Sequence, residues 1–358
     1  MEKNMQLLVD LYNIAAESNH EQEITKAVKK LFVERGCKVK NKDNNLYITK
    51  GKADTYPCIA AHLDEVHSDR GEYEAIYSPQ NDIIYGWSYT HNDFCGIGAD
   101  DKNGIWVALQ MVERLDYCKV ALFRGEEIGC VGSRVAWMNF FKDCRFVLQV
   151  DRRNAGDLIT SISGRMVSDD FMEAITPIAN RFGYKETHGL MTDVETLCEN
   201  GVGISCVNMS CGYYNPHSDV EFTKWSELLN TADFVEQICI WMTDVYTYTY
   251  EPPFVPTYRS TSIGRGIYDW WDNGSYVQTP KTADEKSDEA DMMDIITEDL
   301  YEKMMYDAYF YDVTAEEIWE RDYKQVISLN AFLIAYDNAC DLLYDDMNGG
   351  YYDAWEKK

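Results

Sequence analysis

The stretch Cys58-Ile59-Ala60-Ala61-His62-Leu63-Asp64 places a histidine and an aspartate directly after four apolar residues. A short apolar run is typical of a buried strand, and open α/β sheets bind ligands beyond the carboxyl ends of their strands. In extended backbone Asp64 points to the same side as His62, so its carboxylate can accept the second imidazole N–H. A surface histidine beside a solvated aspartate would have the same local sequence, so the wider pattern has to distinguish the two.

Short apolar segments alternate with amphipathic ones on both sides of this stretch. The periodicity predicts strands at 57–62, 82–87, 118–124, 145–150, 157–162 and 203–210. It predicts helices at 103–115, 132–142, 168–182, 192–200 and 225–245. Two more helices are expected near the N-terminus, the second with a capping box of Ser18 and Glu21, followed by a hairpin over 37–50. This alternation predicts an α/β fold, a three-layer sandwich around a mostly parallel, mixed sheet.

A domain boundary is expected near residue 250. Glu251-Pro252-Pro253 stops the last helical pattern, and 257–290 is rich in Gly, Ser, Thr, Asp and Lys. Helical periodicity then returns. We predict a catalytic domain over 1–250, a linker or wrapping arm over 251–287, and an acidic, tyrosine-rich helical appendage over 288–358.

Charge and cysteine content exclude several classes of partner. The 358 residues carry a formal net charge of −28, which argues against nucleic acid and against anionic membranes. No apolar run approaches the roughly 18–20 residues of a membrane span, and the first residues lack the apolar block of a signal peptide. The 11 cysteines form no C-x-x-C pair, a pattern typical of reduced thiols. We therefore expect a cytoplasmic protein.

Four further motifs place carboxylates or histidine after predicted strands or at a helix start. They are Gly98-Ala99-Asp100-Asp101-Lys102-Asn103-Gly104, Gly125-Glu126-Glu127, Val150-Asp151 and Asn215-Pro216-His217-Ser218. Each alone has an ordinary explanation, such as helix capping for the aspartate pair or a solvated acidic turn for the glutamates. Five such motifs in order favour a shared site. His67 is excluded from a zincin helix motif, because that motif needs a spacing of four from His62 rather than five.

The residue types predict a two-metal hydrolase. One aspartate of the Asp100–Asp101 pair can bridge two cations, although these residues alone do not say which one. Of two adjacent glutamates, one can ligate a cation while the other acts as general base. Imidazoles and carboxylates without a thiolate suit Zn²⁺, with Co²⁺ or Mn²⁺ as further candidates.

The ordered series resembles the co-catalytic di-zinc exopeptidase clan. That clan includes peptidase T, the glutamyl-aminopeptidase-like enzymes, single-domain bacterial aminopeptidases and the carboxypeptidase G group. The likeness covers about residues 5–245 and includes the hairpin at Asp43-Asn44-Asn45-Leu46. It implies one Zn²⁺ held by His62, Asp100 and Asp151, and a second held by Asp100, Glu127 and His217. It further implies that Glu126 is the general base for a hydroxide bridging the metals, and that Asp64 orients His62.

The spacing of the motifs departs from the larger members of the clan. Peptidase T and its relatives insert a lid between the equivalents of Asp151 and His217, and the glutamyl-aminopeptidase-like group inserts a β-domain between those of His62 and Asp100. Only 65 and 37 residues lie in these intervals here, so we expect no inserted lid domain. The groups that a lid would supply have candidate replacements in Arg165, Tyr213, Tyr214 and His188. Thr192-Asp193 resembles a Thr/Ser-Asp pair of the smaller relatives, which makes Asp193 a further candidate for substrate binding, with helix N-capping as the alternative.

The resemblance implies an aminopeptidase that acts on short peptides. Acidic side chains near the site would hold the ammonium group of the peptide. A carboxypeptidase or an N-acyl-amino-acid deacylase is the alternative within the class. That alternative needs a fixed cation for the substrate carboxylate, with candidates in Arg165, Arg152, Arg153 and Lys102. A non-catalytic binding or structural protein on the same fold is the alternative of another class, and the complete set of ligands and base counts against it. The oligomeric state is left open.

Overall fold

The apolar run that leads into His62 forms β3 (Tyr56–His62), an interior strand of an eight-stranded sheet. Every residue of β3 is buried, as expected for a strand covered on both faces. β3 pairs in parallel with β7 (Cys118–Phe123) and with β8 (Cys144–Arg152), and β11 (Cys206–Ser210) continues the parallel arrangement beside β8. The prediction of a mostly parallel, mixed sheet is therefore confirmed by the computed structural model, which describes residues 3–251.

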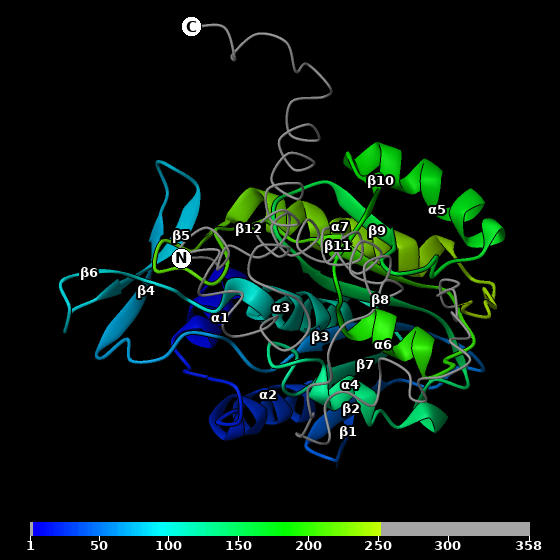
Figure 1. Cartoon of the computed structure of the whole chain (residues 1–358), viewed down its shortest axis with the longest axis horizontal. Coiled ribbons are helices and arrows are strands. Elements are labelled where there is room, and N and C mark those ends of the chain that lie inside the picture. Colours follow the sequence, from blue (N-terminus) through cyan, green and yellow to red (C-terminus); the bar gives the residue numbers. More distant parts are fainter. Residues whose placement is uncertain (1–2, 252–358) are drawn as a thin grey trace, which may run out of the picture. The chain divides into compact units, whose positions relative to one another are not determined.

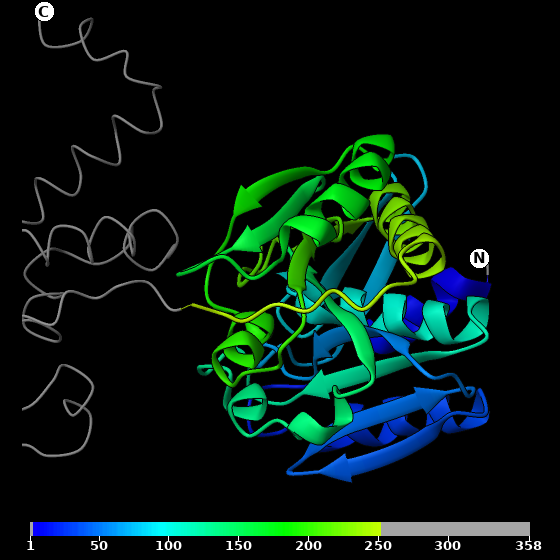
Figure 2. The ribbon, with the colours of Figure 1, turned by 90° about the vertical axis from the view of Figure 1, so that its right-hand side faces the viewer.

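Antiparallel pairing occurs toward both ends of this main sheet. The predicted hairpin is present as β1 (Lys38–Lys42) and β2 (Asn45–Lys50), with β2 antiparallel to β7. At the other end β9 (Asp157–Ser161) runs antiparallel to β11 and parallel to β10 (Lys185–His188). Figure 2 shows the hairpin in blue at one end of the sheet and the β9–β10 pair in green at the other.

Helices cover both faces of the main sheet, which makes three layers. One layer contains α1 (Lys3–Tyr12), α2 (Gln22–Glu34), α3 (Ala99–Arg114), α5 (Asp169–Phe182) and α7 (Trp225–Trp241). The other contains α4 (Val131–Arg134), the 3₁₀ helix η1 (Met138–Phe140) and α6 (Asp193–Glu199). Alternate residues of β3 enter opposite cores, since Ile59 and Ala61 pack in the first layer and Cys58 and Ala60 in the second.

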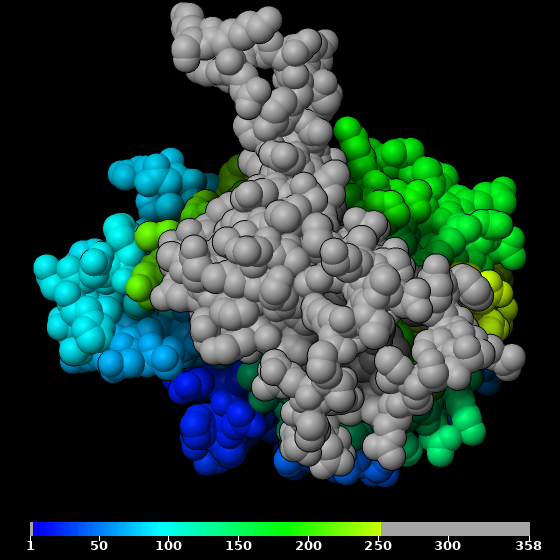
Figure 3. Space-filling model, viewed as in Figure 1, coloured from blue at the N-terminus to red at the C-terminus, as the bar shows by residue number. Residues whose placement is uncertain are grey.

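A second, five-stranded sheet was not expected from the sequence. It contains β4 (Tyr73–Ser78), β5 (Ile83–Ser88), β6 (Asp93–Cys95), β12 (Tyr213–Tyr214) and β13 (Phe222–Lys224). The predicted strand at 82–87 is thus present, but it belongs to this sheet rather than to the main one. Figures 1 and 3 show β4–β6 (blue to cyan) at the end of the described unit opposite α5 (green).

Two local predictions are wrong. The helix expected at 132–142 is only the four-residue α4 and the three-residue η1, because the aromatic side chains of this segment pack around Tyr47 instead of following one helical stripe. The capping box of Ser18 and Glu21 is absent, since α2 begins at Gln22 with no side-chain cap. The Ser18 hydroxyl instead donates to Asp64 Oδ2 at 2.7 Å.

The described residues belong to one compact unit, with no inserted lid domain among them. Its ten cysteines are buried and free of disulfides. None of the helices described is long and apolar enough to span a membrane. The linker predicted at 251–287, apart from Glu251, and the appendage predicted at 288–358 lie outside the described residues.

Candidate metal centre

The sequence motifs converge at the carboxyl ends of the parallel strands. His62 ends β3, Asp151 is the penultimate residue of β8, and Glu126 and Glu127 follow β7. Because these strands are parallel neighbours, their carboxyl ends meet at one edge of the main sheet. The remaining two motifs reach this edge from other elements: Asp100 from the start of α3, and His217 from the loop between β12 and β13.

Asp100 lies between the two histidines. Its Oδ1 is 2.9 Å from His62 Nε2, and its Oδ2 is 3.5 Å from His217 Nε2. Asp151 Oδ1 completes the first group at 3.6 Å from His62 Nε2, and Glu127 Oε2 completes the second at 3.1 Å from His217 Nε2. Each histidine therefore shares Asp100 and has one carboxylate of its own.

The donor set could hold divalent cations. Ligand atoms around a four-coordinate Zn²⁺ lie about 3.4 Å from one another, close to the spacings between these histidines and carboxylates. His62, Asp100 and Glu127 offer atoms within 4.8 Å of each other. Glu127 Oε1 is buried and has no hydrogen-bond partner among the described residues, which leaves a lone pair free for a ligand.

The electrostatics of the site point to missing positive charge. Burial raises the pKa of Asp151 to about 8, and burial also raises the pKa of Glu127. Hydrogen bonds to Asp100 and Glu127 raise the pKa of His217 to about 11. The pKa of His62 also lies well above its usual value, because nearby carboxylates outweigh the effect of its burial. Protons thus compensate the carboxylates here, and a bound cation would displace them.

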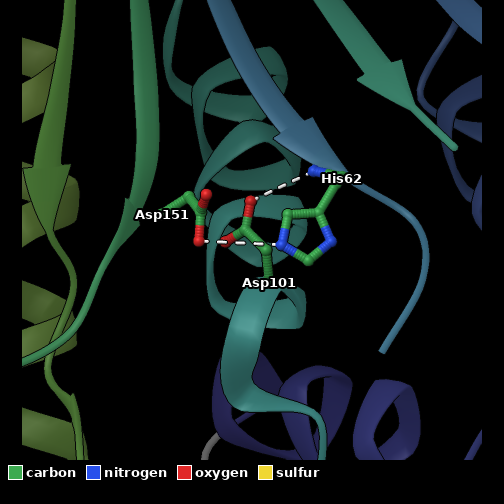
Figure 4. Close-up of side chains that lie close together, drawn as sticks. All are labelled: His62, Asp101 and Asp151. Carbon is green, nitrogen blue, oxygen red and sulfur yellow. Dashed lines mark hydrogen bonds and ion pairs between the residues drawn. The ribbon is translucent and has the colours of Figure 1, made fainter. Parts of the chain in front are cut away.

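Asp101 is a weaker candidate bridge than Asp100. Figure 4 shows its carboxylate close to His62 and Asp151, and the three could in principle surround one ion. However, Asp101 Oδ2 accepts the backbone N–H of His62 at 3.1 Å, and Oδ1 accepts that of Gly104 at 2.9 Å. Both oxygens are thus engaged by backbone amides. Asp100 presents its two oxygens to two different histidines, which favours it as the bridge.

Asp64 connects His62 to the glutamate turn. The His62 Nδ1 atom is 2.9 Å from the Asp64 backbone oxygen, its acceptor when Nε2 binds a cation. Asp64 Oδ1 accepts the backbone N–H of Glu126 at 2.9 Å, and Oδ2 accepts that of Glu127 at 3.3 Å. The same Oδ2 accepts the Ser18 hydroxyl. Asp64 can therefore orient the imidazole and also fix the position of both glutamates.

Neighbouring side chains orient Asp151 in a comparable way. Its Oδ2 accepts from Gln149 Nε2 at 3.0 Å and from Thr192 Oγ1 at 3.1 Å, which leaves Oδ1 facing His62. The buried Tyr213 hydroxyl donates to Asp100 Oδ2 at 3.1 Å and lies 3.4 Å from Asp151 Oδ1. Ser18 and Gln149 were not predicted from the sequence, because neither stands in a motif with the ligands.

Asp193 is buried close enough to interact electrostatically with Glu126. It is 0% exposed, its carboxylate oxygens make no well-aligned hydrogen bond among the described residues, and the Ser133 side chain lies close enough to lower its pKa. Burial raises the pKa of Asp193 to about 7. An uncompensated buried carboxylate is costly, so this residue is suited to receive a positive group.

The other candidates for substrate binding lie apart from these carboxylates. Arg165 and His188 line a hollow of about 590 Å³ together with Ser161, Glu186 and neighbouring residues, and none of the metal-type residues lines it. The Arg165 guanidinium is 2.7 Å from the Asp169 carboxylate, and His188 Nδ1 is 2.6 Å from Ser161 Oγ. The Tyr214 hydroxyl donates to Glu227 at 2.6 Å.

No family model matches the sequence, and no curated protein matches it. Solved structures do match. Aminopeptidase PepT from Bacillus cereus has a TM-score of 0.56 at 15% identity, with 66% of this chain and 97% of that chain covered. A tripeptidase from Staphylococcus aureus has a TM-score of 0.55 at 14% identity, with 66% of this chain and 97% of that chain covered. An aminopeptidase from the archaeon Desulfurococcus kamchatkensis has a TM-score of 0.51 at 15% identity, with 68% of this chain and 97% of that chain covered. The chain therefore has a fold found in aminopeptidases.

Proposed function

We propose that this chain is a metal-dependent exopeptidase, and specifically an aminopeptidase that acts on short peptides. The observation that carries the proposal is the position of Asp100 between His62 and His217, with a separate carboxylate for each histidine. The shared fold of solved aminopeptidases supports the same class of reaction.

In this proposal His62, Asp100 and Asp151 hold one Zn²⁺, and Asp100, Glu127 and His217 hold the other. Co²⁺ or Mn²⁺ would suit the same donors. Bound as a pair, the ions would supply Lewis acidity to the scissile carbonyl and to the attacking water. The residues around them keep the ligands in place: Asp64 through His62, and Gln149 and Thr192 through Asp151.

Glu126 is the proposed general base. It directly precedes the ligand Glu127, and its backbone N–H is fixed by Asp64. Burial raises the pKa of Glu126 well above its usual value, which increases its affinity for a proton from water. The Cys130 thiol lies 3.8 Å from Glu126 Oε1 and can donate to it. The carboxylate would take a proton from the attacking water and pass it to the departing amine.

The charges near the site favour an aminopeptidase over a carboxypeptidase or deacylase. Asp193 is the buried carboxylate we propose for the substrate's ammonium group, since it has no cationic partner among the described ion pairs. Two of the four cations that could hold a substrate carboxylate are engaged: Lys102 is buried in an ion pair with Glu65, and Arg152 lies 3.4 Å from Asp157. Neither is free to bind a peptide's C-terminus. The cytoplasmic location stays a prediction of the sequence.

Mass spectrometry of a peptide pool tests the proposal. Each peptide is supplied with free, N-acetylated and C-amidated ends and is incubated with protein loaded with Zn²⁺, with Glu126→Gln as the matched control. We expect loss of single N-terminal residues, abolished by acetylation and by the substitution. Loss from the C-terminus, or release of the acyl group alone, would replace the aminopeptidase with the rival activities. No cleavage with two ions verified as bound would indicate a binding role.

A further inference from the structure

Glu221 connects the loop that carries His217 to the loop that carries Asp100. It is 1% exposed and lies four residues after His217. Its Oε2 accepts the backbone N–H groups of Ile97 at 2.9 Å and Gly98 at 2.7 Å, and its Oε1 accepts that of Asp100 at 3.3 Å. One carboxylate thus engages three amides at the entrance to α3, where the helix dipole favours a negative charge.

His67 supports the same carboxylate. Its Nε2 is 3.0 Å from Glu221 Oε2, and its side chain is almost completely buried. Gly96 makes this approach feasible, because a Cβ at that position would lie 2.0 Å from the His67 ring. His67 therefore reaches Glu221 from the connection that follows His62.

The Asp100 loop has a second set of contacts that does not involve Glu221. Arg70 donates to the Gly96 carbonyl at 3.0 Å, and Lys102 Nζ donates to the Ile97 carbonyl at 3.2 Å. Both cations pair with the buried Glu65. These bonds hold the loop's carbonyl groups, whereas Glu221 holds its amide groups and connects it to the residues after His217.

The two halves of the candidate centre differ in how much they need this connection. His62 and Asp151 stand on strands and are fixed by Asp64, Gln149 and Thr192. The His217 side chain is 52% exposed, so packing contributes little to its position. Its backbone φ of 60° lies in the left-handed region. Its loop is anchored by the burial of Glu221.

We propose that Glu221 is a positioning residue that aligns Asp100 with His217, so that the cation shared by Asp100, Glu127 and His217 binds tightly only when the Glu221 carboxylate is present. This inference rests on the proposed metal centre. It goes further by assigning the alignment of one half of the centre to a side chain that touches neither ion.

Metal binding by Glu221→Gln tests the inference. The amide keeps the size of the side chain but loses one acceptor and places an N–H₂ group against backbone donors. Competition of metal-free protein with a chelator for Zn²⁺ should show two bound equivalents in the parent. In the variant we expect the affinity for the more weakly bound Zn²⁺ to fall by about 10- to 100-fold, the range for groups that orient metal ligands. The tighter equivalent should change by less than about threefold.

Asp219→Asn is the matched control, because it removes one charge from an exposed residue of the same loop and should leave both affinities unchanged. Thermal unfolding in a chelator establishes that Glu221→Gln folds like the parent. If it does not fold, His67→Ala removes the imidazole partner of Glu221 and should weaken the same equivalent to a smaller extent. Equal affinities in the parent and the folded variant would overturn the inference while leaving the proposed peptidase intact. A parent that binds no Zn²⁺ would overturn both.

Discussion

His62 and Asp151 stand at the ends of neighbouring β-strands, whereas His217 stands on an exposed loop between two short strands of the second sheet. The His62 side chain is 0% exposed and the His217 side chain is 52% exposed. A ligand at a strand end receives its position from the ladder of the main sheet. A proposed ligand on a loop depends more on specific side chains, as the His217 loop does on Glu221 and the Glu126–Glu127 turn does on Asp64.

The largest effect is expected at Glu126, which lies in the turn after β7 and directly precedes the proposed ligand Glu127. Glu126→Gln should reduce kcat by about 10²- to 10⁴-fold, because the amide cannot accept a proton from water. The variant should still bind two equivalents of Zn²⁺, since Glu126 is not a proposed ligand. Near-parental turnover with both ions bound would exclude Glu126 as the base.

Removing each histidine separately compares the two halves directly. His62→Ala should lower the free energy of unfolding of the metal-free protein by about 2–4 kcal/mol, because it leaves a cavity and unpaired buried carboxylates. His217→Ala should lower it by less than His62→Ala does, because its side chain is half exposed and the main loss is its ion pairs with Asp100 and Glu127. Chemical denaturation in a chelator measures both values. Equal losses would show that strand and loop ligands are held alike.

The pH dependence of stability should differ between metal-free and metal-loaded protein. In the metal-free fold the pKa of Asp151 is raised to about 8 and that of His217 to about 11. The folded state therefore binds more protons than the unfolded chain between about pH 4 and 8 for Asp151 and between about pH 6.5 and 11 for His217. Stability contributed by these groups falls as the pH rises through both windows.

Thermal unfolding at about pH 6 and pH 9 measures this effect, with and without Zn²⁺. We expect a melting temperature several degrees lower at the higher pH in a chelator, and a smaller difference with the ion bound. A metal-free protein that is more stable at the higher pH would contradict the charge balance described for the site.

The smallest effect is expected at Ser18, which contacts the Asp64 oxygen shared with Glu127. Ser18→Ala should cost about 1 kcal/mol, or roughly fivefold in kcat/KM, because one hydrogen bond to a charged group is lost while Asp64 keeps its other donors. Glu17→Gln, at an exposed neighbouring position, is the matched control. Equal kcat/KM values for the two variants would remove Ser18 from the support of Asp64.

The sequence alone predicted the central parallel strands of the main sheet, although not β10 or the second sheet, and it predicted a site at the carboxyl ends of those strands. The apolar runs before His62 and Asp151 are local patterns, and burial on both faces requires such runs in any interior parallel strand. Because parallel strands end at a common edge, residues far apart in the chain could be assigned to one site from their positions after those runs.

Only the tertiary structure decided how the ligands are held. The bonds from Ile97, Gly98 and Asp100 to Glu221 connect residues 121 to 124 positions apart. The backbone amides that occupy both Asp101 oxygens support the Asp100 bridge that the resemblance implied, and Ser18 contacts Asp64 instead of capping a helix. Apolar periodicity reports which face of a segment is buried, but it contains no information about which buried polar groups meet. Those pairings form only when separate elements pack and each polar group removed from water must find a partner.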